Sequence, residues 1–174
     1  MIELKSILCP TDFSDSSTNA LLYAVSLAEE YKAKLFLLHV IEDISNAAYF
    51  DMLTAPPLDD MYGEMEKQAW EQLNEAVPEK KREVIKWEPL VHRGVPALEV
   101  VHTAEELGVG LIVLGTHGRG GLKHLLFGSV AEKVVRMAPC PVLTMRHPEH
   151  KMELPDRGDG GPTAGQAEDE GTNP

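Results

Sequence analysis

The sequence contains little cysteine, no long apolar run and fewer basic than acidic residues, and each shortage excludes a class of protein. Two cysteines among 174 residues are too few for a disulfide framework. No apolar run approaches the roughly 18 to 20 residues that a membrane-spanning helix requires. Against 28 Asp and Glu residues there are only 16 Lys and Arg, giving a formal net charge of -12, which argues against a surface that coats nucleic acid.

The start of the chain also lacks the basic region and apolar core of a secretory signal, so we expect a cytoplasmic protein. Its two cysteines, Cys9 and Cys140, fall at the end of one expected strand and at the start of another. In a parallel sheet these are opposite edges, separated by a strand length of roughly 17 to 20 Å. We therefore predict two free thiols, because that separation is well beyond disulfide reach.

Strand-like and helix-like patterns alternate along most of the chain. Short apolar runs predict strands at 3–9, 33–41, 83–92, 110–114 and 142–145. Helical spacing of apolar residues predicts helices at 14–31, 61–77, 96–107 and 129–137, with Ser14 or Ser16 as the cap of the first. This alternation predicts right-handed βαβ units, and so a single α/β domain in which helices cover both faces of a five-stranded parallel sheet.

Each expected helix has an apolar face that should pack on the sheet. These faces contain Leu21, Ala24, Val25, Leu27, Ala28 and Tyr31 in the first helix, Met65, Ala69, Leu73 and Ala76 in the second, and Leu98, Val101 and Ala104 in the third. Residues 42–60 have no clean period and predict a long loop, with one short helix as the alternative. After residue 146, Gly, Pro and acids dominate, so we expect a domain at 1–146 and a disordered acidic tail at 147–174.

The stretch from Leu111 to Val130 combines an apolar strand, a glycine-rich loop and the start of a helix. Four glycines crowd into seven residues after the strand: Gly115, Gly118, Gly120 and Gly121. Ser129 and Glu132 have the Ser-x-x-Glu spacing of a capping box that begins the next helix. Free backbone N–H groups in such a loop and at a helix N-terminus favour a phosphate. The alternative is an ordinary flexible turn in which Ser129 serves only as a helix cap.

The charge pattern around this loop favours an anion site. No Asp or Glu occurs in residues 107–131, although the chain as a whole is strongly acidic. The side chains within that span that can carry positive charge are His117, Arg119, Lys123 and His124. A basic loop in an acidic chain would attract a negatively charged ligand.

A second loop of interest, Pro10-Thr11-Asp12, follows the first strand. If the first and fourth strands are neighbours, in the order 3-2-1-4-5, both loops open into one crevice at the carboxyl ends of the strands. Asp12 could then accept the ribose hydroxyl protons of a nucleotide whose phosphates bind the glycine loop, while Val40 lines an adenine slot. The alternative is that Asp12 only forms an Asx turn or caps the following helix.

These motifs match neither a Walker A loop nor a dinucleotide fingerprint, because no Gly-Lys-Ser/Thr occurs and the glycines follow the fourth strand. The spacing Gly, two residues, Gly, nine residues, Gly, Ser resembles the nucleotide motif of the universal stress protein family, and it is carried here by Gly115, Gly118, Gly128 and Ser129. Cys-Pro-Thr-Asp-Phe-Ser at 9–14 and Ala-Pro-Cys-Pro-Val-Leu at 138–143 also look like that family. The resemblance covers the whole of the expected domain.

The resemblance implies a Rossmann-like fold of the adenine nucleotide alpha hydrolase type. It also implies a bound ATP, with AMP or ADP as alternatives, Mg²⁺ or Mn²⁺ held by the phosphates, and a homodimer joined through the last strand, Val142 to Met145. Carried over residue by residue, the nucleotide contacts fall at Pro10, Thr11, Asp12, Val40, Gly115, Thr116, His117, Gly118, Arg119, Gly120, Gly121, Gly128, Ser129, Val130 and Ala131. We expect an unidentified protein partner, and no binding to nucleic acid or membrane.

Two functions remain open for such a site. The first is an ATP-binding regulatory module of the stress response, and the alternative is a slow ATPase or another nucleotide-dependent enzyme. Hydrolysis needs charge stabilisation and a positioned water. Arg119 and Lys123 could stabilise charge, but we find no general base beside the phosphate loop, so we expect binding rather than efficient catalysis.

Overall fold

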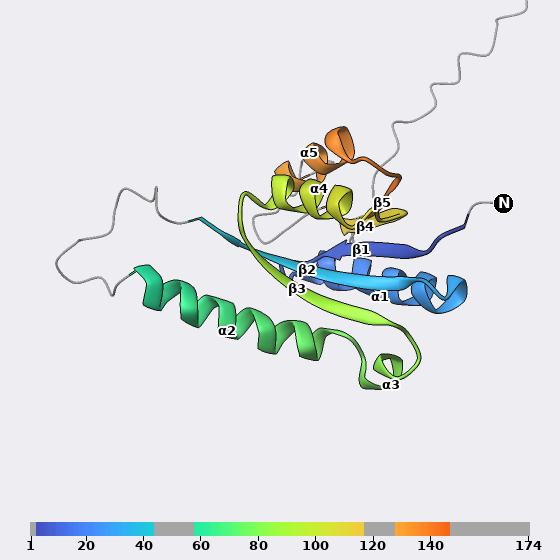
Figure 1. Ribbon diagram of the computed structural model, residues 1–174, viewed down its shortest axis with the longest axis horizontal. Helices are drawn as coiled ribbons and strands as arrows, with labels where there is room; N and C mark the ends of the chain where they lie inside the picture. The colour runs from blue at the N-terminus through green and yellow to red at the C-terminus, as the bar shows by residue number, and fades with distance from the viewer. Residues whose placement is uncertain (1–2, 44–57, 117–127, 147–174) are drawn as a thin grey trace, which may run out of the picture.

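The protein is built on a five-stranded parallel sheet with helices on both faces (Figure 1). The computed structural model describes residues 3–43, 58–116 and 128–146. The strands are β1 (Ser6–Pro10), β2 (Lys34–Glu42), β3 (Trp87–Gly94), β4 (Leu111–Gly115) and β5 (Val142–Met145). The helices are α1 (Asp15–Tyr31), α2 (Leu58–Ala76), α3 (Glu79–Arg82), α4 (Pro96–Glu106) and α5 (Ser129–Met137). The strand order is β3-β2-β1-β4-β5, as predicted.

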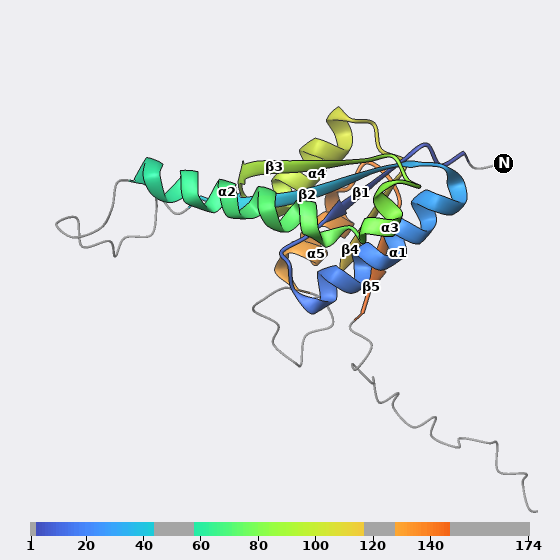
Figure 2. The same ribbon diagram turned by 90° about the horizontal axis from the view of Figure 1, so that it is seen from below.

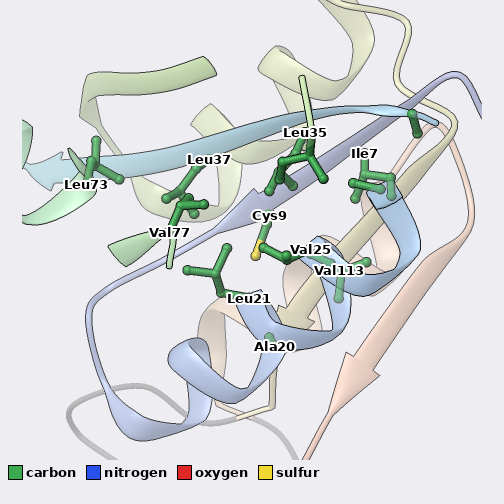
Figure 3. Close-up of a cluster of buried hydrophobic side chains, with 14 residues drawn as sticks. Ile7, Cys9, Ala20, Leu21, Val25, Leu35, Leu37, Leu73, Val77 and Val113 are labelled. Atoms are coloured by element: carbon green, nitrogen blue, oxygen red, sulfur yellow. The ribbon is translucent and has the colours of Figure 1, made fainter. Parts of the chain in front are cut away.

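Two apolar layers, one on each face of the sheet, form the core. On one face α1 and α2 pack against alternate strand residues such as Ile7, Cys9 and Leu37 (Figure 3), and Figure 2 shows these two helices together on the near side of the sheet. On the other face α4 and α5 pack against the intervening residues, among them Leu8 and Leu38. Because Ile7, Leu8 and Cys9 are completely buried, β1 is covered on both faces and forms the centre of the fold.

All the strands run in the same direction, so the segments that follow them gather at one edge of the sheet. At this carboxyl edge β1 lies between β2 and β4, to which it is hydrogen-bonded. Pro10, the last residue of β1, pairs with Leu38, whereas β2 continues to Glu42. The end of β2 therefore extends beyond the end of β1.

The predicted start and apolar face of α1 are largely confirmed. Ser14 is the N-cap, and its side chain accepts a hydrogen bond from the backbone N–H of Ser17. Leu21, Ala24, Val25 and Ala28 are buried as expected, and Leu27 packs at the margin of the core. The prediction is wrong for Tyr31, which is 54% exposed because it ends the helix, beyond the last turn that contacts the sheet.

The predicted apolar face of α2 is only half right. Ala69 and Leu73 are buried, and these are the only buried residues in the helix. Ala76 is half-buried, whereas Met65 is 36% exposed instead of packed in the core. Figures 1 and 2 show the N-terminal end of α2 extending past the ends of the strands, and both buried residues lie in the second half of the helix.

The predicted apolar face of α4 is wrong for two of its three residues. Ala97, Val100 and Thr103 are buried together with Ala104, whereas Leu98 is 42% exposed and Val101 is half-buried. The buried face is made mainly of small residues, which let the helix approach the sheet closely. Choosing the bulkiest apolar side chains therefore gave the wrong orientation of the helix.

The third strand starts later than predicted, at Trp87 rather than at residue 83. The preceding residues form α3 and a turn, in which the backbone N–H groups of Val84 and Ile85 both donate to the carbonyl of Lys81. Val84 is 61% exposed and Ile85 is buried. Local backbone hydrogen bonding thus removes residues 84 and 85 from the sheet, although their side chains are those of a strand.

Cys9 and Cys140 are free thiols, as predicted. Beyond their separation along the strands, they also lie in different layers, since Cys9 belongs to the layer under α1 and Cys140 packs against the layer under α4 and α5. Burial raises the pKa of the Cys9 thiol to about 12, and burial also raises the pKa of Cys140. Within the three described ranges, no helix has the length and apolar character needed to cross a bilayer.

Candidate functional site

The turn after β1 and the start of the glycine loop lie in direct contact at the carboxyl edge. A Cβ atom added to Gly115 would lie 2.6 Å from the Oγ of Ser16 and 2.8 Å from its carbonyl carbon. Ser16 belongs to the first turn of α1, four residues after Asp12. The absent side chain of Gly115 therefore lets the N-terminus of α1 approach the end of β4, and it brings the two candidate loops together.

Thr11 fixes the turn that follows β1. Its backbone N–H donates to the carbonyl of Leu38 at 2.8 Å, and its side-chain oxygen accepts from the N–H of Phe13 at 3.0 Å. The same oxygen lies 3.1 Å from the Oγ of Ser17. With only 8% of its surface exposed, Thr11 contributes to the site chiefly by holding the turn in place.

Asp12 forms the Asx turn that the sequence left open as an alternative. Its Oδ1 accepts the N–H of Ser14 at 3.1 Å and the hydroxyl of Ser14 at 2.6 Å. A carboxylate offers about four acceptor positions and keeps its negative charge while it makes such bonds. The turn and a contact with a ribose are therefore compatible roles for this residue.

Phe13 in this turn and His39 on β2 beside it were not among the predicted site residues. Phe13 has a φ of 62°, a left-handed conformation that costs an ordinary residue roughly 1–2 kcal/mol. The Nδ1 of His39 lies 2.8 Å from the carbonyl oxygen of Thr11, so Nδ1 must carry the proton and donate it. The two rings lie 4.5 Å apart between centroids. A histidine inside the otherwise apolar end of β2 was the one sequence signal that could have indicated this contact.

Pro10 and Val40 lie on neighbouring strands at the carboxyl edge. Both are half-buried, Pro10 at the end of β1 and Val40 on the part of β2 that extends beyond it. Val40 packs at the margin of the layer under α4 and α5. Since neighbouring strand residues point to opposite faces, Val40 and His39 line different sides of this edge.

The two ends of the glycine loop are hydrogen-bonded to each other. Thr116 is 1% exposed, and its carbonyl accepts the N–H of Gly128 at 2.6 Å. The N–H of Thr116 donates to the carbonyl of Met145 at the end of β5, at 2.9 Å. Residues 117–127, which include the predicted His117, Gly118, Arg119, Gly120 and Gly121, lie outside the described residues. The loop therefore leaves the sheet and returns at one point, beside the start of α5.

The predicted Ser129 capping box is wrong, because Gly128 is the N-cap of α5 and Ser129 is the first helical residue. The Gly128 carbonyl accepts the N–H of Glu132 at 3.0 Å, and no side chain caps the helix. The Glu132 carboxylate instead pairs with Arg136 one turn later, at 2.9 Å. The first backbone N–H groups of α5, those of Ser129, Val130 and Ala131, have no intrahelical acceptor.

No protein-held metal site accompanies these residues in the described part of the chain. Residues 3–43, 58–116 and 128–146 contain no group of three or more His, Cys, Asp or Glu side chains that could hold a metal ion. A cavity of about 210 Å³ lies elsewhere, lined by Ile41, Tyr62, Glu66, Val91, His92 and Arg93. It shares no residue with the predicted nucleotide contacts, so we do not assign it to the same site.

Comparison with known proteins places this geometry in a family. The model of the universal stress protein family matches residues 3–146. Universal stress protein MJ0531 of Methanocaldococcus jannaschii is 38% identical over 149 residues, covering 83% of this chain and 84% of that protein. The solved structure of MJ0577, from the same organism, has a TM-score of 0.68 and 27% identity, and the match covers 83% of this chain and 97% of the other.

A further solved structure with this fold is that of a universal stress protein in complex with cAMP. It has a TM-score of 0.61 and 22% identity, and the match covers 84% of this chain and 99% of that one. The family match extends over all five strands, from β1 to the end of β5. The chain therefore belongs to the universal stress protein family.

Proposed function

We propose that this protein binds ATP at the carboxyl edge of its sheet and acts as a nucleotide-dependent regulatory module of the stress response. The observation that carries the proposal is the uncapped N-terminus of α5 beside the closed ends of the glycine loop. Unpaired N–H groups and the positive end of the helix dipole favour a phosphate there. The contact between Gly115 and Ser16 brings the acidic turn at Asp12 to the same edge.

Each predicted residue has a distinct part in this proposal. The N–H groups of Ser129, Val130 and Ala131 would donate to phosphate oxygens, together with backbone groups of the glycine loop. Asp12 would accept hydrogen bonds from the ribose hydroxyls, and Pro10 and Val40 would contact adenine. Gly115 has a different role from the one predicted, because Ser16 occupies the space that a side chain at position 115 would need.

The form of the nucleotide and its metal follow from the same chemistry. The three phosphates of ATP would accept hydrogen bonds from all the backbone N–H groups of the glycine loop and the start of α5. The fewer phosphates of AMP or ADP would leave some of these N–H groups without a partner. Mg²⁺ or Mn²⁺ would be held by the phosphates, since hard cations of this kind are commonly bound through substrate phosphates. The relative in complex with cAMP has the same fold, but its sequence identity of 22% is too low to indicate which nucleotide this chain binds. The choice of ATP rests on the residues of this chain.

Regulation rather than hydrolysis is the better supported activity at this edge. Asp12 and His39, two ionisable side chains of the described residues at this edge, both hydrogen-bond to the turn after β1. Neither is positioned as a free general base for an attacking water. A bound nucleotide would instead order the loops at this edge and change the surface offered to other proteins.

We propose also that the protein forms a homodimer through β5. This strand lies at the edge of the sheet and is hydrogen-bonded to β4 on one side. The outer row of backbone groups on an edge strand can pair with a second copy, and Leu143 on β5 is 38% exposed. Sedimentation with and without ATP would test whether the dimer forms and whether it depends on the nucleotide.

Isothermal titration calorimetry with ATP, AMP and inorganic triphosphate tests the binding site. Gly128→Val should reduce ATP affinity at least tenfold, because its side chain would stand in front of the α5 amides. Gly63→Val is the matched control, since Gly63 lies on α2 with no atom within 4 Å of an added Cβ. Unchanged ATP affinity in Gly128→Val would reject this site.

A second variant separates the ribose contact from the phosphate contact. Asp12→Asn keeps a side-chain oxygen for the Asx turn but removes the charge and half of the acceptor capacity. ATP affinity should fall severalfold, while affinity for inorganic triphosphate should stay the same or rise. Equal losses for the two ligands would reject the ribose role of Asp12.

A further inference from the structure

The first half of α2 buries no side chain and meets the described residues mainly through Tyr62, whose hydroxyl donates to Asp43 at 2.8 Å and whose ring centroid lies 4.3 Å from the Arg93 guanidinium. Residues 58–68 contain no buried side chain, and only Ala69 and Leu73 are buried in the whole 19-residue helix. In Figures 1 and 2 the N-terminal end of α2 extends past the ends of β2 and β3, while Tyr62 and Glu66 line a cavity with residues of both strands. Helices in proteins are stabilised mainly by the packing of an apolar face, so a projecting half-helix lacks its usual source of stability.

Apolar side chains are nevertheless aligned on this projecting half. Leu58, Met61 and Met65 are spaced at i, i+3 and i+7, which places them on one stripe. Leu58 is 42% exposed, Met65 is 36% exposed and Met61 is half-buried. We call these three residues the α2 patch. Methionine is flexible and polarizable, and it is common on surfaces that adapt to a partner.

A row of carboxylates runs beside the α2 patch. Asp60, Glu64, Glu71 and Glu75 are all exposed and are spaced at i, i+4, i+11 and i+15, which places them along one ridge of the helix. Successive helix residues are rotated by about 100°. Around the helix, the α2 patch therefore lies between the buried residues Ala69 and Leu73 on one side and the row of carboxylates on the other. Altogether α2 carries six acids and a single base, Lys67.

We propose that the first half of α2 is a docking surface for a basic amphipathic helix of a partner protein. The apolar face of such a helix would cover the α2 patch, and its Lys or Arg side chains would lie along the row of carboxylates. A second copy of this chain is the wrong occupant, because it would bring six more acids against these six. The proposal does not depend on nucleotide binding, since it uses none of the residues of the carboxyl edge.

A pair of synthetic peptides tests the docking surface on the full-length protein. The first has 18 residues with Leu at i, i+3, i+4 and i+7 spacing and Lys elsewhere, and the second has the same composition in scrambled order. Calorimetry at low and at physiological salt should show at least tenfold tighter binding of the patterned peptide, with weaker binding at higher salt. Equal binding of both peptides would overturn the proposal, because it would show attraction by charge alone.

Matched variants locate the surface on the molecule. Met65→Ser should lower the affinity for the patterned peptide at least fivefold. Met137→Ser, at a 40% exposed methionine of α5, should leave that affinity unchanged. The double variant Glu64→Gln with Glu71→Gln should lower affinity and reduce its salt dependence. Its control is Glu105→Gln with Glu106→Gln, which removes the same charge from exposed positions of α4. Equal losses in a variant and its control would reject α2 as the surface.

Two further outcomes would assign the patch to a different occupant. If Met65→Ser converts a dimer to a monomer in sedimentation, a second copy covers the patch and the proposal is wrong. A second variant would have residues 45–56 replaced by a Gly/Ser linker. If this variant binds the patterned peptide and the wild-type chain does not, residues 45–56 cover the patch and the proposal is wrong. Circular dichroism of each variant checks that its helix content is unchanged.

Discussion

The N-termini of α1 and α5 lie at the same edge of the sheet and are terminated in opposite ways. At α1 the Ser14 hydroxyl accepts the N–H of Ser17, and Asp12 in turn accepts the Ser14 hydroxyl. At α5 the cap is Gly128, which has no side chain to bond to the first amides. A side chain thus satisfies one of the first amides of α1, whereas those of α5 have no such partner among the described residues and are available to a ligand.

This difference indicates which features of a strand-helix junction are structural and which are functional. Both junctions contain small polar residues and both follow strands in the middle of the sheet. Only the junction at Gly128 follows a loop whose ends are tied together, through the Thr116 carbonyl. The capped junction holds the acidic turn in place, and the uncapped junction is the one suited to an anion.

The closeness of the two junctions depends most strongly on Gly115. Gly115→Ala would place a Cβ 2.6 to 2.8 Å from atoms of Ser16, and overpacking of this kind costs ~3 kcal/mol, at the upper end of its usual range. We expect a loss of this size in urea unfolding. Gly63→Ala, at an exposed helix position with open space, should instead gain ~0.5–1 kcal/mol. Equal stability of the two variants would contradict the contact.

The contrast between capped and uncapped helix starts can be measured with two serines. Ser14→Ala should cost about 1 kcal/mol of unfolding free energy, the usual loss for an N-cap side chain. Ser129→Ala should leave stability nearly unchanged, because Ser129 is the first helical residue and makes no capping bond. A loss in Ser129→Ala as large as that in Ser14→Ala would show that Ser129 caps α5 after all.

A cap added to α5 should produce the smallest change in stability and a large change in binding. Gly128→Asp would supply the missing side-chain acceptor, worth only a few tenths of a kcal/mol over glycine at an N-cap. Its carboxylate would occupy the positive end of the helix and repel phosphate. We expect slightly raised stability in thermal unfolding and at least tenfold weaker ATP binding in calorimetry. If stability rises and ATP affinity is unchanged, the α5 amides do not bind the nucleotide.

Much of the fold could be predicted because it follows from spacing alone. The bounds of β5 and the end of α1 were predicted correctly, and the strand order was expected from the need to bring two loops together. Apolar spacing did not give the orientation of α4, where small residues rather than Leu98 face the sheet. It also could not show that the first half of α2 buries no side chain, because the length of one element relative to its neighbours is a tertiary property.

The candidate site was harder to predict in detail. Ser129 has the right spacing to Glu132 for a capping box, but Gly128 is equally able to occupy an N-cap, and the sequence does not decide between them. Nothing in the sequence pattern indicates that Phe13 adopts a left-handed conformation, and a histidine in the apolar end of β2 was the one signal that His39 holds the carbonyl of Thr11. Gly115 was expected to make room for a ligand, and its described neighbour is Ser16 instead.

The most direct test of the account follows individual backbone amides by NMR. Uniformly ¹⁵N-labelled protein would be titrated with inorganic triphosphate, which lacks the ribose and adenine that contact other parts of the edge. The account predicts that the amide signals of Ser129, Val130 and Ala131 shift, while those of Ser16, Ser17 and Thr18 at the start of α1 stay in place. Shifts confined to the start of α1, or no shift at α5 when the ligand is bound, would contradict it.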